Sequence, residues 1–229
     1  MKRRFTRPGR AWLAVMLMIA LLAGVGGAAE SPPLTGDPAA IERAAASVVR
    51  LEVYDDRGDR IGTGSGFAAF DPVVLVTACH VIVNMDHMIA TRDDGAQFRI
   101  ERAINADEDN DLALCALPED AGLEPLNLST EKLMRGAGVV AIGSQFGLIN
   151  LATIGNVCGI WRTEDTDWIL YTAPVSSGSS GGPLLDDGGR VIGIITGTYD
   201  KGQLLNLAAT AEAASTLYRT TTNEGGTSK

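Results

Sequence analysis

The chain has 229 residues, of which 45% are hydrophobic and 5% aromatic, and it carries a formal net charge of −9. This length is that of one ordinary domain or one pair of small barrels, with enough apolar residues for a core. The first 29 residues hold five of the 19 Lys and Arg and no acidic residue, so the remainder has 14 basic against 28 acidic residues, a net charge of −14. This negative charge argues against nucleic acid as a partner.

Residues 1–29 have the composition of a secretory signal peptide. Basic residues precede an apolar run from Ala11 to Val25, and the small residues Gly27-Ala28-Ala29 offer a cleavage site. The protein is therefore predicted to be exported, either periplasmic or secreted. The apolar run approaches the ~17 residues that span a bilayer, so an uncleaved anchor facing the periplasm is the alternative, and membrane contact is expected only in that case.

The rest of the chain favours β structure. Residues 30–46 are interpreted as a linker and a short helix, with Asp37 as its cap and Pro38 at its first position. From residue 48 on, short apolar runs are broken by Gly, Asp and Pro, which is typical of an all-β chain. Strands are expected near 48–54, 61–70, 73–77, 97–104, 112–117, 138–143, 151–161, 168–172, 183–186, 190–198 and 203–207. The crossing at 118–133 separates two sets of strands, and a closing helix over 208–219 precedes a predicted disordered tail over 220–229.

A serine lies among glycines in the segment Gly178–Pro183, whose letters are GSSGGP. Glycine and proline favour a turn here over a helix or strand. In such a turn, backbone N–H groups can point into one small volume and stabilise an oxyanion beside an exposed hydroxyl. Ser180 is therefore the candidate nucleophile, and the N–H groups of Gly178 and Ser180 are the candidate oxyanion hole.

A serine nucleophile needs a base and a carboxylate that orients the base. His80 ends an apolar strand-like run, whereas His87 follows a polar stretch and is interpreted as a solvated turn histidine. Asp111 begins the apolar run 111–117 and is the candidate carboxylate, although Asp109 is close by. The serine turn also fits the G-x-S-x-G elbow of α/β-hydrolases, but no histidine follows Ser180, so the order His, Asp, Ser of chymotrypsin fits best.

Several segments, in this order, resemble trypsin-like serine proteases and most closely the bacterial HtrA/Deg group. They are GSGF at 64–67, TACHV at 77–81, DLAL at 111–114, AIG with FGL within 141–148, the strand 153–158 and GSSGGP at 178–183. The resemblance implies a protease domain over 47–219, built from two antiparallel six-stranded β-barrels at about 47–120 and 134–207. A PDZ domain, which HtrA proteins usually carry, is not expected within this length. The glycine-rich stretch 62–66 lacks the Lys-Ser/Thr of a phosphate loop and is interpreted as a strand bend.

These features predict a serine endopeptidase that acts through a Ser180-His80-Asp111 triad and an acyl-enzyme, on polypeptide substrates and without a metal or other cofactor. Two departures from the family pattern motivate an alternative: Gln145 stands where a loop proline is usual, and Ser179 where Asn or Asp precedes the nucleophile. The alternative is a peptide-binding or chaperone-like module whose oxyanion hole is unformed until a partner binds. The oligomeric state is not predicted.

The residues expected to line the pocket for the substrate side chain before the scissile bond are apolar. Pro174 and Val175 precede the nucleophile, and Ile194, Ile195 and Thr196 are expected on the opposite wall. A charged substrate side chain would lose its hydration there without gaining a partner. We therefore expect cleavage after small or aliphatic residues, most readily in unfolded proteins, as the HtrA resemblance also implies.

Overall fold

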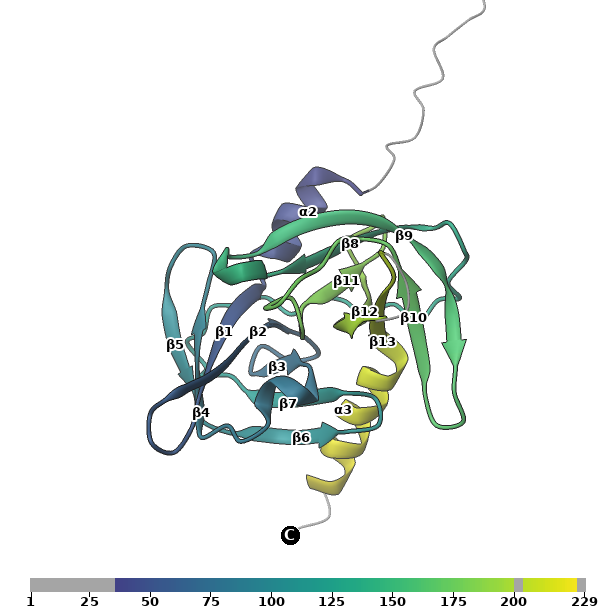
Figure 1. The fold of residues 1–229 in the computed structure, drawn as a ribbon. Coiled ribbons are helices and arrows are strands. Elements are labelled where there is room, and N and C mark those ends of the chain that lie inside the picture. Colours follow the sequence, from purple (N-terminus) through teal and green to yellow (C-terminus); the bar gives the residue numbers. More distant parts are fainter. Residues whose placement is uncertain (1–35, 200–203, 226–229) are drawn as a thin grey trace, which may run out of the picture. The chain divides into compact units, whose positions relative to one another are not determined.

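The computed structural model describes residues 36–199 and 204–225 (Figure 1). The predicted signal segment and the linker up to residue 35 lie outside the described residues. Helix α2 (Pro38–Ala45) begins as expected, because the Asp37 carboxylate accepts a hydrogen bond of 3.0 Å from the Ala39 N–H and proline occupies the first turn. Within the described ranges, neither helix is long and apolar enough to cross a bilayer.

The first set of strands forms one curled antiparallel sheet. Its strands are β1 (Val48–Tyr54), β2 (Arg60–Ala68), β3 (Val74–Thr77), β4 (His87–Thr91), β5 (Gln97–Ile100), β6 (Ala103–Asp107) and β7 (Leu112–Ala116). They are ordered β5-β4-β1-β2-β3-β7-β6. Only Glu101 and Arg102 separate β5 from β6, so the two edges of the sheet are consecutive in the chain and the sheet must curl. A closed six-stranded barrel was expected for this lobe, whereas the structure has a seven-stranded half-barrel. The difference arises because the predicted strand 97–104 breaks at these two residues into β5 and β6.

The second set of strands closes into a barrel. Its strands are β8 (Gly138–Gly143), β9 (Leu151–Arg162), β10 (Asp167–Tyr171), β11 (Pro183–Leu185), β12 (Val191–Thr198) and β13 (Asn206–Thr210). Their order is β10-β13-β12-β11-β8-β9, and each pair is antiparallel. The predicted all-β architecture with two lobes is confirmed, and Figure 1 shows the purple-to-teal sheet beside the green barrel.

Three clusters of buried side chains hold the lobes together. One fills the curled sheet and includes Leu51 and Met88, and another fills the barrel and includes Leu184. The third lies between them and joins Phe67 of β2 to Leu185 of β11. Side chains alternate along a strand, so β11 sends consecutive leucines to opposite faces, one into the barrel and one to the other lobe. The nucleophile turn, which precedes β11, is thereby placed at the junction of the lobes.

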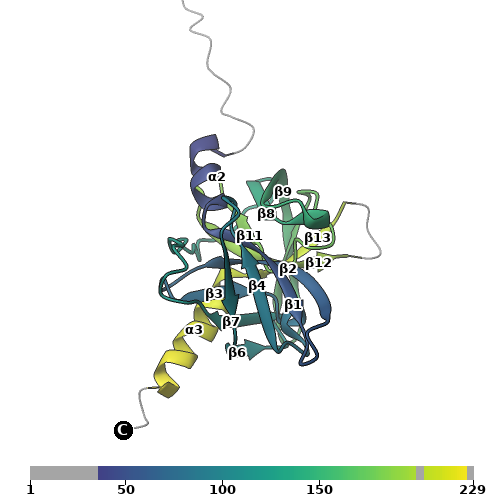
Figure 2. The same cartoon turned by 90° about the vertical axis from the view of Figure 1, so that its left-hand side faces the viewer.

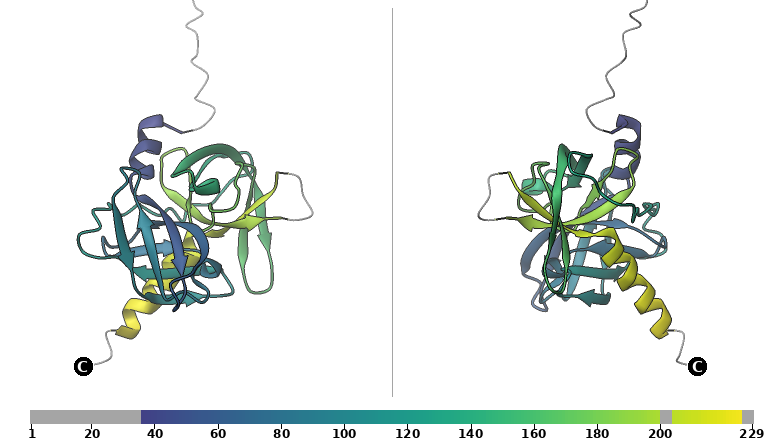
Figure 3. Two further views of the ribbon diagram at one scale, coloured as in Figure 1. Left: turned by 60° about the vertical axis from the view of Figure 1, so that its left-hand side comes forward. Right: turned by 90° about the vertical axis from the view of Figure 1, so that its right-hand side faces the viewer.

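The C-terminal helix differs from the prediction at both ends. Residues 206–210 form β13, and helix α3 (Ala211–Gly225) continues through residues expected to be a disordered tail. The helix leaves the barrel and packs against β6 of the curled sheet (Figures 2 and 3), where the Asn105 amide donates to the Thr221 hydroxyl at 2.9 Å. Threonine is a poor helix former, and this tertiary contact overrides its propensity. The prediction of a tail is therefore wrong for 220–225, and 226–229 lie outside the described residues.

His87 does not lie in a solvated turn. It is the first residue of β4, its side chain is 14% exposed, and its ring stacks on Tyr54 with centroids 5.1 Å apart. The strand was missed because the polar residues before it favour a turn, whereas its pairing with β1 is a long-range contact.

Candidate active site

His80 and Asp111 are brought together by two paired strands. His80 lies in the short 3-10 turn Cys79–Ile82 that follows β3, and Asp111 immediately precedes β7. Because β3 and β7 are antiparallel neighbours, the end of one lies beside the start of the other. Asp111 has a left-handed φ of 50°. Its carboxylate oxygens Oδ2 and Oδ1 lie 2.8 and 3.0 Å from Nδ1 of His80, and Oδ1 also accepts from the His80 backbone N–H at 2.9 Å.

The Asp111 carboxylate assigns the roles of the two imidazole nitrogens. A carboxylate only accepts hydrogen bonds, so Nδ1 of His80 carries the proton and Nε2 is left as the base. The hydrogen bond to Asp111 raises the pKa of His80 above its ordinary value, against the opposing effect of burial. The neighbouring Cys79 has a raised pKa because of its burial and the negative charge of Asp111. Its thiol therefore stays protonated, which disfavours a thiolate nucleophile.

Ser180 lies in the loop between β10 and β11, packed against the turn that carries His80. A Cβ at Gly181 would lie 2.9 Å from the Ala78 nitrogen, so the backbones touch there. The Ser180 hydroxyl donates to the Thr196 carbonyl at 3.2 Å, and the described contacts include no hydrogen bond from it to His80. The Ser180 hydroxyl has a single proton and must leave the Thr196 carbonyl before it can donate to His80, and catalytic hydrogen bonds are often unmade without substrate.

The backbone of the nucleophile loop is held through its carbonyl groups. Each carbonyl from residue 177 to residue 180 accepts one hydrogen bond, in chain order from the Phe146 N–H (3.0 Å), the Ser65 hydroxyl (2.7 Å), the Gly182 N–H (3.0 Å) and the Ser65 N–H (2.8 Å). The Ser177 carbonyl faces Phe146, and in a trans peptide the N–H points the opposite way. The Gly178 N–H therefore points away from Phe146.

The N–H groups of this loop divide into three that are hydrogen-bonded and two that have no acceptor among the described residues. The N–H groups of Ser179, Gly181 and Gly182 donate to backbone carbonyls at 2.7 to 3.0 Å. Those of Gly178 and Ser180 have no acceptor among the described residues. They are the two groups predicted to form the oxyanion hole.

The two residues that depart from the family pattern have structural roles. Gln145 is 7% exposed, and its amide donates to the Pro174 carbonyl at 3.4 Å, where Thr153 also donates at 2.7 Å. Ser179 is 1% exposed, and its hydroxyl accepts from the Ser176 N–H at 3.4 Å. Both side chains therefore hydrogen-bond to the backbone of residues 174–176, just before the serine turn.

The predicted pocket residues divide between two places. Ile195 and the partly buried Val175 pack in the barrel cluster, Pro174 is exposed, and Thr196 presents its carbonyl to Ser180. Ile194 instead belongs to the cluster between the lobes, because neighbours on a strand face opposite sides. The side chains of Ile194 and Ile195 therefore face opposite sides of β12.

Three residues that support the site were not predicted from the sequence. The buried Asn206 amide donates to the Ala173 carbonyl at 2.7 Å, Phe146 holds Ser177, and Ser65 holds two carbonyls of the loop. Ser65 and Phe146 both lie in segments that resemble the family, GSGF at 64–67 and FGL at 146–148, whereas Asn206 lies in none of them. All three contacts join residues that are far apart in the chain.

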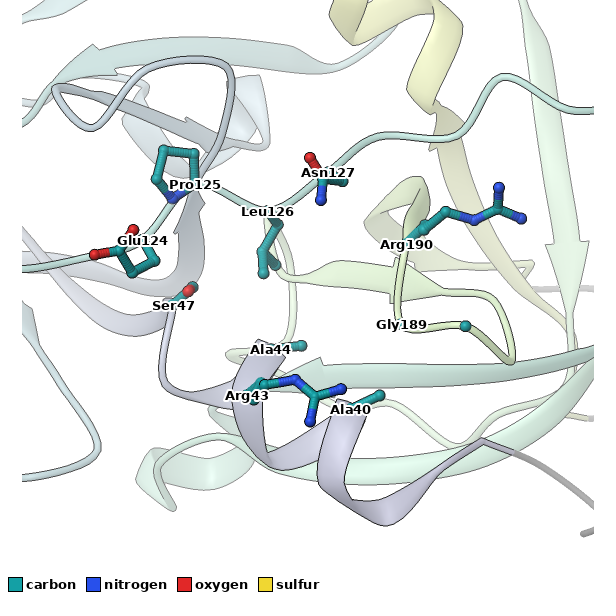
Figure 4. A pocket seen from close by; sticks show the side chains of 11 residues that line it. Ala40, Arg43, Ala44, Ser47, Glu124, Pro125, Leu126, Asn127, Gly189 and Arg190 are labelled. Carbon is teal, nitrogen blue, oxygen red and sulfur yellow. The ribbon is translucent and has the colours of Figure 1, made fainter.

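A cavity of about 340 Å³ lies away from this site, between α2, residues 124–127 and the turn 188–190 (Figure 4). Arg43 and Arg190 line it, together with Glu124. None of His80, Asp111 and Ser180 reaches it. The cavity is therefore not part of the candidate active site.

The curled sheet, the closed barrel and the serine turn at their junction define a chymotrypsin-like fold. A family profile described as a trypsin-like peptidase domain matches residues 64–194, and the chain belongs to this family.

The relatives of the chain include HtrA proteases. Serine protease HTRA1 of Xenopus laevis is 34% identical over 170 residues, which cover 68% of this chain and 37% of that protein. Anti-sigma-I factor RsgI9 of Acetivibrio thermocellus is 34% identical over 155 residues, which cover 67% of this chain and 22% of that protein. The solved structure of the HtrA-type protease AlgW with tripeptide has a TM-score of 0.73 and 26% identity, covering 81% of this chain and 63% of that one. The chain thus matches less than half the length of the first two relatives.

Proposed function

We propose that this protein is a serine endopeptidase that cleaves unfolded polypeptides through an acyl-enzyme. The Ser180 oxygen bonds to the peptide carbonyl carbon while Nε2 of His80 takes the hydroxyl proton and then gives it to the leaving amine as the C–N bond breaks. Water, activated by the same nitrogen, releases the acyl group. Asp111 keeps the imidazole in the required tautomer, and the N–H groups of Gly178 and Ser180 stabilise the oxyanion.

The observation that carries this proposal is the pair of free N–H groups beside the His80–Asp111 pair. The alternative, a module with an unformed oxyanion hole, would require a backbone carbonyl turned into that space or an N–H bonded elsewhere. The hydrogen bond from Phe146 holds the Ser177 carbonyl away. This arrangement favours a site that is competent without a partner.

The residues near the serine support a preference for aliphatic side chains. Val175 and Ile195 are apolar, and the buried Asn206 side chain, which donates to the Ala173 carbonyl, is neutral. No carboxylate lies in the segments 173–180 and 194–198 to pair with Arg or Lys. Burying an unpaired charge costs several kcal/mol, whereas a Val, Ala or Leu side chain gains from burial.

We expect the chain to hydrolyse casein, with most new C-termini at Val, Ala or Leu. The measurement is digestion of casein followed by mass-spectrometric sequencing of the products, with heat-inactivated protein as the control. The absence of any hydrolysis would contradict the peptidase proposal. An Arg and Lys majority would instead overturn the assignment of the pocket alone.

The pH dependence should report His80 as the base. Acylation requires neutral imidazole, and the hydrogen bond to Asp111 raises the pKa of His80 above 6.5, so kcat/KM should rise with pH and reach half its maximum above 6.5. Initial rates on a fluorogenic peptide ending in valine would measure this profile. A rate that stays flat from about pH 5 to pH 8 would exclude His80 from this role.

A further inference from the structure

Ser65 lies in β2 of the curled sheet, yet its polar atoms serve the loop of the other lobe. The side chain is fully buried, and its hydroxyl donates to the Gly178 carbonyl at 2.7 Å while accepting the Ser144 N–H at 2.9 Å. Its own N–H donates to the Ser180 carbonyl at 2.8 Å. The hydroxyl uses its one donor and accepts one hydrogen bond inside the protein, so removing it would leave the Gly178 carbonyl and the Ser144 N–H buried without this partner.

These bonds fix the peptide groups on both sides of Gly178. The Gly178 carbonyl is held directly by the Ser65 hydroxyl. The preceding peptide is held by the Phe146 N–H, and Phe146 follows Ser144, which is bonded to the same hydroxyl. Gly178 has a left-handed φ of 97°, a conformation that glycine adopts without strain. The direction of its N–H therefore depends on Ser65 through two routes.

Ser65 also holds the peptide groups on both sides of the one that carries the Ser180 N–H. That N–H belongs to the peptide between residues 179 and 180, and Ser65 holds the carbonyls of the peptides before and after it. Close packing reinforces these bonds, because a Cβ at Gly64 would lie 3.2 Å from the Ser180 carbonyl oxygen. The two lobes thus meet through backbone at this point.

We propose that Ser65 is a positioning residue that holds the N–H groups of Gly178 and Ser180 in the orientation that the oxyanion needs. This inference rests on the proposed peptidase function. It gives the GSGF segment a role in the reaction beyond that of a strand bend. Ser65 itself touches neither the substrate nor the reacting atoms.

The test is the Ser65→Ala variant of the full chain. We expect kcat on the fluorogenic peptide to fall by about 10²-fold, near the loss that follows removal of one oxyanion donor. KM should stay within about twofold, and the pH at half-maximal rate should not move, because the pocket and His80 are unchanged. A purely structural role would lower thermal stability and leave kcat per folded molecule unaltered.

Hydrogen exchange gives a readout that does not need activity. In Ser65→Ala the Ser144 N–H loses its acceptor. The peptide group that contains the Ser179 N–H is also released, because its carbonyl, that of Gly178, no longer accepts from Ser65. Exchange at both amides should accelerate by at least about tenfold. Thr91→Val is the matched control, since it removes another buried hydroxyl of the curled sheet, one that accepts from Gln97 at 3.1 Å. That variant should alter neither kcat nor the exchange of these amides.

A graded series covers the case in which Ser65→Ala does not fold. Ser65→Cys keeps the shape with a weak donor and acceptor, so its kcat should lie between those of the natural chain and Ser65→Ala, at least about tenfold below the natural chain. Unchanged kcat in either variant, with unchanged exchange, would overturn the positioning role. If the natural chain hydrolyses nothing, the peptidase proposal fails, and faster exchange in Ser65→Ala would still support the holding of the loop.

Discussion

Replacing Ser180 by alanine should abolish peptide hydrolysis, with kcat lower by roughly 10⁶-fold, because the group that forms the acyl-enzyme is removed. The fold should be kept, since among the described residues the hydroxyl makes a single hydrogen bond, of 3.2 Å, to the Thr196 carbonyl. Rates on the fluorogenic peptide and covalent labelling by a fluorophosphonate probe would measure the loss. Peptide mapping of the labelled natural chain should place the adduct on Ser180.

Ser179→Ala is the matched control for this experiment. The Ser179 hydroxyl only accepts a bond of 3.4 Å from the Ser176 N–H, whereas its backbone groups hold the turn. This variant should keep fluorophosphonate labelling. Equal labelling of Ser180→Ala and the natural chain would show that the nucleophile had been assigned to the wrong residue.

Replacing Asp111 by asparagine should lower kcat by roughly 10⁴-fold while leaving the fold intact. The asparagine amide can donate to Nδ1 of His80, which would put the proton on Nε2 and remove the base. The hydrogen bond to Asp111 is also the main cause of the raised pKa of His80. Loss of that bond should therefore move the half-maximal pH of any residual activity downward.

Asp109→Asn is the comparison that tests the choice between the two neighbouring carboxylates. Asp109 is exposed, whereas Asp111 makes the 2.8 Å contact with the imidazole. Asp109→Asn should retain near-natural kcat and the same pH profile. Equal losses of kcat/KM in both variants would instead indicate that the net charge of the protein affects substrate binding. In that case KM of both variants should rise most at low salt, where exposed charges are least screened.

The oxyanion hole connects the proposed peptidase activity with the proposed positioning role of Ser65. Loss of Ser180 or Asp111 removes a chemical group, whereas loss of Ser65 only relaxes the peptides around Gly178. The three variants should therefore rank in activity as Ser65→Ala above Asp111→Asn above Ser180→Ala. A reversed order would mean that the loop depends on Ser65 for folding more than for catalysis.

Local patterns in the sequence determined the fold class and the candidate residues. Alternating apolar runs predicted most strands, including 48–54 and 138–143 with the observed bounds, because a strand with one buried face repeats every second residue. The helix start at Pro38 followed from its cap. Glycines around a serine, and a histidine and an aspartate beside apolar runs, marked three residues of which His80 and Asp111 are in contact.

Long-range contacts decided the rest. The break between β5 and β6 places these consecutive strands at the two edges of the curled sheet, and the helix beyond residue 219 depends on Thr221 meeting Asn105. The division of Ile194 and Ile195 between two clusters depends on which face of β12 meets the other lobe. The hold of Ser65 on Gly178 joins residues 113 positions apart, which no local pattern encodes. Burial makes such contacts specific, because a polar group taken from water must find its partner wherever the packed strands bring one.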